Sequence, residues 1–569
     1  MIGAAKSDID TKDQMATKVY DALVIGSGAA GSFAAKELTE RGLDVLVLEA
    51  GRNITPADFE SDFKGPREKG IQLWARARAA VTGQPIQSKV ALYGKQLRHL
   101  FVNDRENPYS TPADNPFLWI RGKQLGGRLH TYGRVLMRWS DYDFKAASRD
   151  GYGEDWPICY DELSPYYSRV EEFLGIYGCE DNVPNVPNGK FLGRSKLTEA
   201  ETDFKAKTHT RWPERTPIAW RYMPPNIKRI PQPLLAAKNT GRLTVQTDAV
   251  VSQITTDPAT GKATGAEFIH RVTRERSTVS ARVVLVCAST IESVRLLLNS
   301  TSPKHPKGLG NSSGTLGHYF MDQVPSMIVG SVPGRVGWEK DDTVAPDPFY
   351  GVTGGVYIPR FENLDRVTNP NFARGFAYQG TIGRLFVKEG KAAKFAVMGF
   401  GEMLPNHANA ITLNRSKTDA WGLPIPHIVC AKSPNEVAML REQTRAIKEM
   451  ALNAGLEVEF NGSSLGLEEG PGGAFPEADW FSRLLFRKNF TKSMAMGAAI
   501  HETGGARMGA DPASSVLNGR NQCWDVPNVF VTDGSSFTSG GCAGATLTIM
   551  ALTVRACEFI AGEVAAGRL

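Results

Sequence analysis

Residues 22–52 read ALVIGSGAAGSFAAKELTERGLDVLVLEAGR, and this stretch decides the fold. An apolar run at 22–25 ends in the glycine turn GSGAAG at 26–31. A helical segment follows, and a second apolar run at 45–48 ends at Glu49. The order of strand, glycine turn, helix, strand and acid is what a dinucleotide site in a parallel α/β sheet requires. The stretch therefore predicts a Rossmann-like domain.

Each glycine of the turn has a separate task in such a site. Gly26 allows the tight turn, Gly28 lets the backbone approach a pyrophosphate, and Gly31 lets the helix pack on the strand. The N-terminus of the helix presents unpaired N–H groups to the phosphates, and Glu49 accepts hydrogen bonds from a ribose. A glycine-rich turn without a ligand is the alternative, but the flanking strands and the acid argue against it.

The length and composition narrow the class of protein. With 569 residues, of which 41% are hydrophobic, the chain is too long for one core and predicts two large domains or one elaborated domain. The net charge of +6 is small for this length, so we expect neither a nucleic acid nor a membrane surface as partner. The N-terminal segment is polar and charged, unlike a signal peptide, and no apolar run is long enough to span a membrane.

The seven cysteines lie far apart in the sequence, and no CxxC pair occurs. This spacing predicts neither a zinc site nor a local iron–sulfur site, and no metal site is expected. An odd and scattered count of cysteines fits reduced thiols, so we expect a cytoplasmic protein.

Beyond the first unit, apolar periodicity predicts further elements. Residues 53–115 lack sustained periodicity and are expected to wrap over the surface or to cover a site. Residues 119–127 read as a short strand that runs into a glycine pair, and the β-rich middle of the chain, about 324–490, looks like a separate layer. Helices are expected at 161–174, 290–298, 435–452 and 547–564, and strands at 243–286 and 529–531.

The C-terminal part of the chain carries a candidate base. The strand at 529–531 ends in Asp533-Gly534, and it can return to the N-terminal sheet, where its loop would face the same cofactor. Just upstream lies HETGGARMG at 501–509. A neutral imidazole in such a loop can take the proton of an alcohol, which makes His501 the candidate. On residue type alone a structural histidine is the alternative, and four others have comparable claims: His305, His318, His407 and His427.

Taken together, these segments carry a resemblance. The turn at 26–31, the segment at 501–509 and the tail VTDGSSFTSGGCAGATLTIMALTVRA at 531–556 resemble those of the glucose–methanol–choline (GMC) flavin oxidoreductases. The resemblance extends over nearly the whole chain. Further segments are similar to the bacterial branch that oxidises sugars and glycosides, often at C3: 138–143, 155–157, 310–314, 321–322 and 419–424.

The resemblance implies an α/β fold with a Rossmann-like FAD-binding domain and a second, substrate domain built on a mostly antiparallel sheet covered by helices. We expect the first domain to span 18–323, completed by 496–569, and the substrate domain to span 324–495. The resemblance also implies that FAD accepts a hydride from a sugar or glycoside while His501 takes the hydroxyl proton. The product would be a 3-keto sugar, and the oligomeric state is not readable from the sequence.

The resemblance also implies which residues form the site. By residue type, Gln379 and His407 are candidates for the substrate side, and Tyr350, Phe376, Tyr378 and Gln379 itself either line a sugar pocket or belong to the core. A strand residue, Val250 or Val251, is expected to meet the adenine. The positions expected to contact FAD are Gly26, Ser27, Gly28, Ala29, Ala30, Gly31, Glu49, Ala50, Arg52, Gly126, Gly127, His130, Val250, Ala288, Asp533, Gly534, Ala545 and Thr546.

One position departs from the family pattern. The family places a second catalytic residue, His or Asn, where this chain has Gly544. Because glycine holds neither a proton nor a hydroxyl, His501 would act alone, with a water, or with a residue such as His407 or Gln379. The alternative is a flavin-binding homologue in which alcohol oxidation is altered or lost. A third reading, an NAD(P)-dependent dehydrogenase, is allowed by the glycine loop but disfavoured by the tail.

Two further expectations concern electron transfer and flavin attachment. Dehydrogenases that pass electrons to a cytochrome often carry a cysteine cluster, but residues 221–233 contain none. Electrons are therefore expected to leave to O2 or to a diffusible acceptor. Some relatives attach FAD through a histidine after the glycine pair; here His130 is one position out of register, so we favour non-covalent FAD, with a covalent bond as the alternative.

Overall fold

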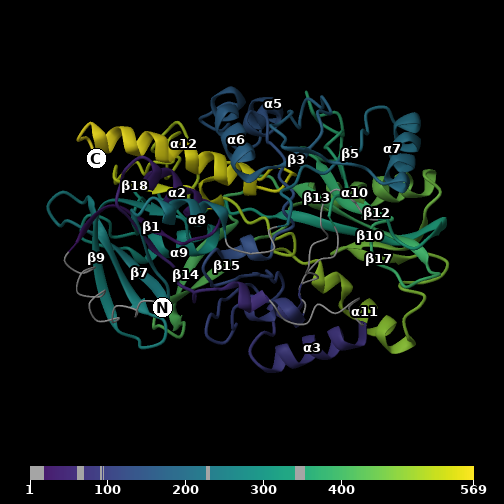
Figure 1. Ribbon diagram of the computed structural model, residues 1–569, viewed down its shortest axis with the longest axis horizontal. Coiled ribbons are helices and arrows are strands. Elements are labelled where there is room, and N and C mark those ends of the chain that lie inside the picture. Colours follow the sequence, from purple (N-terminus) through teal and green to yellow (C-terminus); the bar gives the residue numbers. More distant parts are fainter. Residues whose placement is uncertain (1–17, 60–68, 90–92, 94, 226–230, 340–352) are drawn as a thin grey trace, which may run out of the picture.

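The computed structural model describes residues 18–59, 69–89, 93, 95–225, 231–339 and 353–569 (Figure 1). The expected N-terminal lead and Tyr350 lie outside these residues. The first unit forms as expected: β1 (Val19–Ile25), α2 (Ala29–Glu40) and β2 (Val45–Leu48) follow one another. The two strands pair in parallel, with Ala22 opposite Val45. Their apolar side chains are almost wholly buried, because helices and strands cover both faces of a parallel sheet.

The first sheet has seven strands in the order β6-β2-β1-β9-β8-β7, with β18 paired to β9. The chain therefore returns from its C-terminal region to the N-terminal sheet, as the tail predicts. The last helix, α12 (Thr546–Ala565), packs on α2 beside this sheet (Figure 1). The remaining strands are β6 (Leu243–Gln246), β7 (Ala249–Thr256), β8 (Ala263–His270), β9 (Arg276–Val286) and β18 (Val529–Val531).

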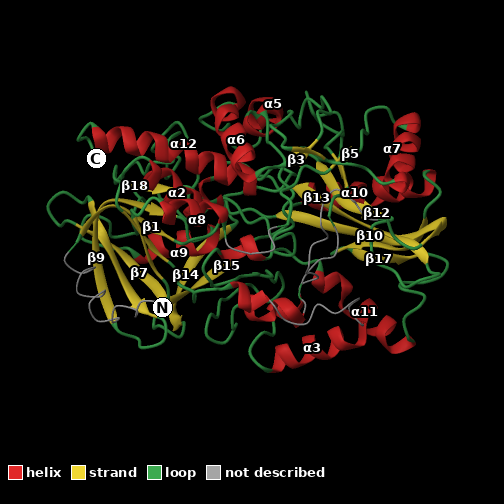
Figure 2. Cartoon of the chain, viewed as in Figure 1, coloured by secondary structure: helices red, strands yellow, loops and turns green. Residues whose placement is uncertain are grey.

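The second sheet also has seven strands, in the order β17-β16-β10-β13-β12-β11-β5, and all its pairs are antiparallel. The two sheets lie at opposite ends of the long axis of the molecule (Figure 2). Helix α10 (Pro434–Asn453) packs on β10, β13 and β16. The strands are β5 (Ile218–Ala219), β10 (Gln323–Val336), β11 (Val356–Ile358), β12 (Phe376–Ile382), β13 (Ala392–Glu402), β16 (Glu457–Ser463) and β17 (Gly466–Glu469). The expected two-sheet architecture is confirmed.

Two segments lie across the expected domain bounds. Strand β5, far upstream of residue 324, pairs with β11 in the second sheet. The hairpin of β14 (Ala410–Thr418) and β15 (Pro424–Val429) packs instead on α9 (Thr290–Asn299) of the first domain. Arg295 and Asp419 join the two in a buried ion pair of 2.7 Å. The domain division of the sequence thus stays a proposal, with these two exchanges.

One expectation about local structure is wrong, and one helix was not expected. Helix α3 (Lys69–Val81) lies within residues 53–115, where the sequence shows no sustained periodicity. Residues 119–127 form no strand, and only an isolated bridge pairs Gln124 with Arg52.

The other helices and strands are α4 (Asp141–Phe144), α5 (Ala146–Asp150), α6 (Tyr160–Leu174), α7 (Glu199–Arg211), α8 (Gln232–Asn239), α11 (Trp480–Ser493), β3 (Tyr177–Gly178) and β4 (Gly193–Arg194). Short 3-10 turns occupy Pro56–Phe59, Gln87–Lys89, Lys95–Leu100, Gly127–His130 and Gly534–Ser536. Within the described ranges, none of the helices has the length and apolar character needed to cross a bilayer.

Candidate active site

The glycine turn after β1 has the geometry that close packing imposes. Gly26 has φ +99°, and a Cβ added there would overlap the carbonyl oxygen of Cys287. A Cβ on Gly31 would overlap the carbonyl oxygen of Gly26, so α2 and β1 approach as only glycine permits. A Cβ on Gly28 would meet no atom of the described residues within 4 Å. The backbone at Gly28 is therefore open to a ligand.

A buried acid ties this turn to the end of β2. The Glu49 carboxylate accepts hydrogen bonds from Ser27 N at 3.1 Å, from the Ser27 hydroxyl, and from Gly51 N at 2.8 Å. Burial raises the pKa of Glu49. Beside it, Ala50 packs against the cluster of Val250 and Trp421. The acid and the strand residue expected at the adenine end thus lie together.

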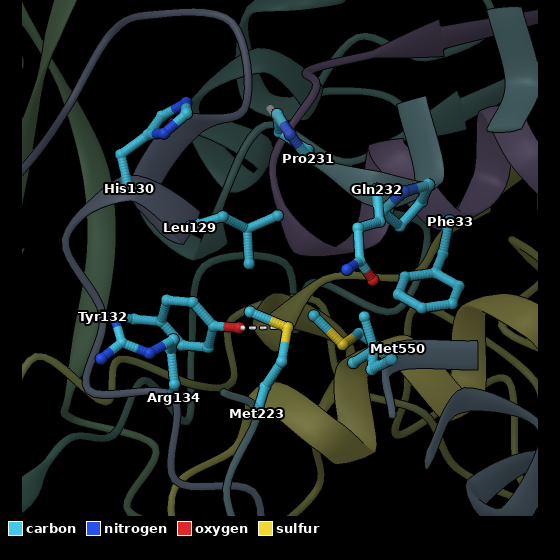
Figure 3. A pocket seen from close by; sticks show the side chains of 11 residues that line it. Phe33, Leu129, His130, Tyr132, Arg134, Met223, Pro231, Gln232 and Met550 are labelled. Atoms are coloured by element: carbon cyan, nitrogen blue, oxygen red, sulfur yellow. Dashed lines mark hydrogen bonds between the residues drawn. The ribbon is translucent and has the colours of Figure 1, made fainter. Parts of the chain in front are cut away.

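The glycine pair adjoins the same turn. Gly126 N donates to the Ser27 hydroxyl at 2.9 Å, and a Cβ on Gly127 would lie 3.3 Å from Gly28 Cα. His130 is buried, with Nε2 2.7 Å from the carbonyl oxygen of Leu125. It lines a pocket between the 129–134 loop, α2 and α12 (Figure 3). The lining residues include Phe33, Leu129, Tyr132, Met223, Gln232 and Met550.

The C-terminal loop closes the site from a third side. Asp533 accepts hydrogen bonds from Ser535 N at 3.0 Å and from the Ser293 hydroxyl at 2.5 Å. The same hydroxyl accepts from Ala288 N at 3.0 Å, so the ends of β9 and β18 are held together. The Thr290 hydroxyl donates to the carbonyl oxygen of Glu502 at 2.7 Å. This bond anchors the residue that follows His501.

These segments fit an extended dinucleotide. Helix α2 begins at Ala29 without a side-chain cap, and its first N–H groups have no partner within the helix. They can bind phosphate oxygens where the backbone at Gly28 is open. The expected positions Arg52, Ala545 and Thr546 border the same region: Arg52 bridges to Gln124 beside the glycine pair, and Ala545 and Thr546 begin α12.

A tight hydrogen-bond network fixes the orientation of His501. Its backbone N–H donates to Asp322 Oδ1 at 3.0 Å, and its Nδ1 lies 2.6 Å from Gln323 Oε1. The Gln323 amide nitrogen donates to the carbonyl oxygens of Gly541 and Ala543, at 2.9 and 3.1 Å. Because this amide nitrogen is committed to carbonyls, Oε1 faces the ring and must accept from it. Nδ1 therefore carries the proton, and Nε2 keeps a free lone pair.

The surroundings keep this imidazole uncharged. Burial and, to a lesser extent, the nearby cation Arg128 lower the pKa of His501 to about 4. Arg128 pairs with Glu502 at 2.8 Å and donates to the Ser289 hydroxyl at 3.0 Å. At neutral pH His501 is thus a neutral base with a directed lone pair.

Gly544 lies beside that lone pair. A Cβ added to Gly544 would lie 3.6 Å from His501 Nε2 and 4.0 Å from the Val135 carbonyl oxygen. The residue is partly exposed between the buried Ala543 and Ala545. The structure thus brings together the two positions that the sequence pairs as catalytic, His501 and Gly544. The ring of Phe400 lies on the base at a centroid distance of 5.2 Å.

The substrate-side candidates separate in the structure. Gln379 lies partly buried on β12, with its Nε2 3.9 Å from where a Cβ of Gly133 would be. His407 is exposed and stacks on His318 at 3.9 Å, so it is not brought to His501, and the expectation that it supports the base is wrong. Phe376 and Tyr378 are core residues, at most 1% exposed.

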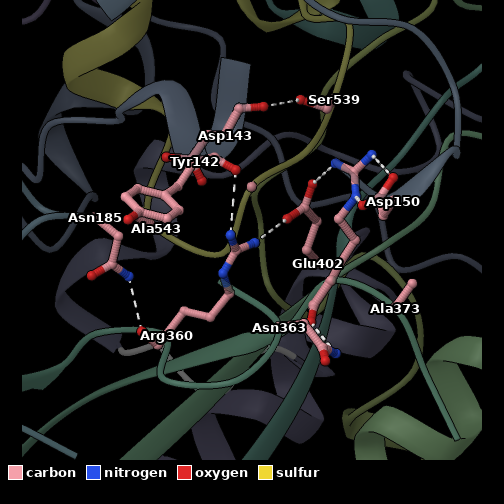
Figure 4. A network of polar contacts seen from close by, with 12 residues as sticks. Tyr142, Asp143, Asp150, Asn185, Arg360, Asn363, Ala373, Glu402, Ser539 and Ala543 are labelled. Atoms are coloured by element: carbon pink, nitrogen blue, oxygen red, sulfur yellow. Dashed lines mark hydrogen bonds and ion pairs between the residues drawn. The ribbon is translucent and has the colours of Figure 1, made fainter. Parts of the chain in front are cut away.

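A buried ionic network supports this region (Figure 4). Glu402 pairs with Arg374 at 2.7 Å and with Arg360 at 3.4 Å. Glu402 is the register partner of Gln323 across β10 and β13, so the network adjoins the residue that orients His501. Sequence reasoning missed Gln323, Arg128 and Glu402. The one available signal was the position of Gln323 next to Asp322 in the segment quoted for the resemblance.

Comparisons with known proteins agree with this arrangement. A family model described as GMC oxidoreductase matches residues 405–553, and one described as an NAD(P)-binding Rossmann-like domain matches 24–75. The 2-methyl-1,2-propanediol dehydrogenase of Mycolicibacterium austroafricanum is 29% identical, over 95% of each chain. Paromamine 6'-oxidase of Streptomyces fradiae is 25% identical, over 98% of this chain and 93% of that one. These matches support the GMC oxidoreductase family.

The solved structures agree at the level of the fold. A formate oxidase variant from Aspergillus oryzae RIB40 superimposes with a TM-score of 0.61, at 15% identity, over 97% of this chain and 99% of that one. Pyridoxine 4-oxidase from Mesorbium loti gives 0.58, at 16% identity, over 95% and 98%. GMC oxidoreductases are FAD-dependent enzymes that act on CH–OH groups. The chain is therefore an FAD-dependent oxidoreductase that acts on CH–OH groups, with FAD as its cofactor.

Proposed function

We propose that this enzyme oxidises a secondary hydroxyl of a sugar or glycoside, at C3, to give a 3-keto sugar. The observation that carries the proposal is the oriented neutral base: Gln323 holds Nδ1 of His501, and Nε2 is free to take the hydroxyl proton. When bound, FAD supplies the acceptor for the hydride of the carbinol carbon. The protein contributes position and charge control.

The names of the relatives support a hydroxyl-rich substrate. Besides the diol dehydrogenase and the paromamine oxidase, they include a fructose dehydrogenase large subunit from Gluconobacter japonicus, 23% identical over 96% of this chain. In our proposal the substrate is a small molecule, and the electrons leave to O2 or to a diffusible acceptor. Gln379 is the proposed substrate-side residue. Its Nε2 lies 3.9 Å from where a Cβ of Gly133 would be, and the carbonyl oxygen of the nearby Val135 lies 4.0 Å from where a Cβ of Gly544 would be.

The flavin is proposed to bind without a covalent bond. His130 Nε2 is occupied by the carbonyl oxygen of Leu125, which leaves this nitrogen poorly placed for attachment. The residues proposed to hold FAD are those of the glycine turn, Glu49 to Arg52, the pair Gly126–Gly127, Val250, Ala288, and the loop from Asp533 with the start of α12.

A second candidate function is a flavin-binding homologue in which alcohol oxidation is altered or lost. The observation that favours it is Gly544, which gives the base no side-chain partner on its Nε2 side. Loss of one such donor weakens catalysis but need not abolish it.

The visible spectrum of the purified holoenzyme distinguishes the two functions. Under anaerobic conditions, glucose and a panel of glycosides are added, and bleaching of the flavin band is followed. Bleaching by one or more of them supports sugar oxidation, and readmission of air then separates an oxidase from a dehydrogenase. A band that stays unbleached with every sugar contradicts the proposal. Product analysis by NMR checks the C3 position.

A further inference from the structure

The backbone does not require glycine at position 544. Its φ lies outside the left-handed region, and an added Cβ would meet only contacts of ordinary van der Waals length. A larger side chain would extend towards His501 Nε2. Glycine therefore keeps a space open beside the atom that takes the proton.

Among the residues that the structure describes, the side chains in contact with His501 have no donor left for that space. Both N–H groups of the Gln323 amide have carbonyl acceptors, at Gly541 and Ala543. Phe400 presents an aromatic ring to His501. Arg128 is tied to Glu502 and Ser289 on the side of the FAD loops. When Nε2 removes a proton, negative charge grows on the substrate oxygen, and a hydrogen-bond donor next to it stabilises the transition state.

We propose that the substrate supplies this donor itself: it is a vicinal diol or polyol, and the hydroxyl next to the reacting carbon occupies the space over Gly544. In this arrangement the reacting O–H proton goes to His501 Nε2, and the neighbouring hydroxyl donates a hydrogen bond to the same oxygen. The hydride of the C–H bond leaves with its two electrons to FAD, and the carbinol becomes a carbonyl. The inference rests on the proposed function and specifies its substrate class.

The space over Gly544 also explains why a neighbouring group is accommodated. A substituent on the adjacent carbon needs room on the Nε2 side of His501, and a side chain at position 544 would occupy it. An enzyme with a donor at that position would bring its own hydrogen bond and leave less room. A donor side chain at position 544 and a neighbouring hydroxyl of the substrate cannot occupy the same space. Substitution of Gly544 therefore tests which of the two supplies the hydrogen bond.

The test compares matched substrates in three forms of the holoenzyme. Glucose is set against its 2-deoxy and 4-deoxy analogues, and propane-1,2-diol against propan-2-ol, with wild type, Gly544→Asn and Gly544→Ala. The anaerobic rate of flavin reduction at saturation is read separately from the apparent Kd. In wild type, removing one neighbouring hydroxyl is expected to lower the reduction rate on the order of 10–100-fold, the worth of one hydrogen bond to a charged group.

Gly544→Asn is expected to lessen this difference, because the amide donates in place of the lost hydroxyl. Gly544→Ala fills part of the space without a donor, so it should slow the diols and leave the deoxy penalty in place. Equal reduction rates for the diol and for its deoxy analogues in wild type would overturn the inference while leaving sugar oxidation intact. A larger deoxy penalty in Gly544→Asn than in wild type would also overturn it. No flavin reduction by any substrate in any form would instead contradict the proposed function.

Discussion

Glycines lie at both ends of the candidate site, but for different reasons. In the turn after β1, a Cβ on Gly26 or Gly31 would overlap a backbone carbonyl. At the reaction end, a Cβ on Gly544 would fit, and it would only approach His501 Nε2. The first glycines are imposed by the packing of strand and helix. The second is not imposed by packing, so its explanation has to come from the chemistry beside the base.

This difference separates fold from specificity. The dinucleotide end is fixed by backbone geometry, and any chain with this turn would repeat it. The reaction end is formed by residues from distant segments: β10 supplies Gln323, the loop before β18 supplies His501, and the loop before α12 supplies Gly544. Substitutions at the two ends should therefore fail in different ways.

The largest effect is expected from alanine at the packed glycine. Gly31→Ala forces α2 away from β1, which we expect to cost at least about 3 kcal/mol of unfolding free energy and most of the bound FAD. The matched control is Gly544→Ala, where the backbone accepts a Cβ and the free energy of unfolding should change by less than about 1 kcal/mol. Thermal unfolding and flavin content of the purified proteins measure both. Equal destabilisation by the two substitutions would contradict the view that packing requires glycine at position 31 but not at position 544.

A smaller effect, confined to the cofactor, is expected at Gly28. Within the part of the chain that the structure describes, its added Cβ meets no atom within 4 Å, so Gly28→Ala should leave the apoprotein as stable as wild type. It should weaken FAD binding at least about tenfold, since the backbone can no longer approach the pyrophosphate. Titration of apoprotein with FAD, followed by flavin fluorescence, gives the Kd. Unchanged affinity would mean that the phosphates bind elsewhere.

At the reaction end, Gln323→Met tests the orientation of the base. Methionine keeps the length of the side chain but cannot accept from Nδ1 or donate to Gly541 and Ala543. We expect the flavin reduction rate to fall on the order of 10–100-fold, with flavin content retained. Gln323→Glu places a carboxylate beside Nδ1, which raises the pKa of His501, so the acid limb of kcat/KM should move to higher pH. Met and Glu variants with the same pH profile would argue against the contact.

The smallest effect is a shift in pH dependence. Because the pKa of His501 lies near 4, kcat/KM should stay level as pH falls from 7 and drop only well below the ordinary histidine range. Arg128→Gln removes a positive charge, so protonation of His501 becomes easier and the acid limb moves to higher pH. The surface variant Arg335→Gln, at an exposed pair with Glu199 and Asp203, should leave the limb in place. Coincident profiles of Arg128→Gln and wild type would exclude Arg128 as a cause.

The free energy of unfolding should also depend on pH through the protonation of His501. The pKa of His501 is lower in the folded state than in the unfolded chain, so the unfolded chain binds more protons between pH 6.5 and 4. Stability should therefore decrease as pH falls through this interval, and His501→Gln should reduce the decrease. Unfolding free energies in urea at pH 7 and pH 5 measure it.

The sequence was most informative where structure is local. The β1–α2–β2 unit, α6, α9, α10, β18 and α12 follow from periodicity within single segments, and they form close to the expected bounds. Helix α3 was missed because residues 60–115 mix charged, aromatic and proline residues without a clear stripe. Residues 119–127 predict a short strand before a glycine pair, but arginine, lysine and glutamine interrupt their apolar residues, and only Gln124 makes a bridge.

The candidate site was predictable only as far as motifs extend. His501 and Gly544 come from segments with a specific pattern, and the structure places them side by side. Gln323 lies 178 residues from His501 in sequence, and a glutamine at the start of an alternating strand has no signal of its own. The same limit explains the error at His407, since nothing local distinguishes an exposed histidine stack from a site residue.

We propose that His501 takes the hydroxyl proton of the substrate while the hydride is transferred to FAD. The most direct test of this proposal is the anaerobic flavin reduction rate, by stopped flow, of wild type, His501→Ala and the exposed control His407→Ala, all at matched flavin content. We expect a loss of about 10²–10⁴-fold in His501→Ala and a wild-type rate in His407→Ala. A wild-type rate in His501→Ala, with FAD fully bound, would contradict it.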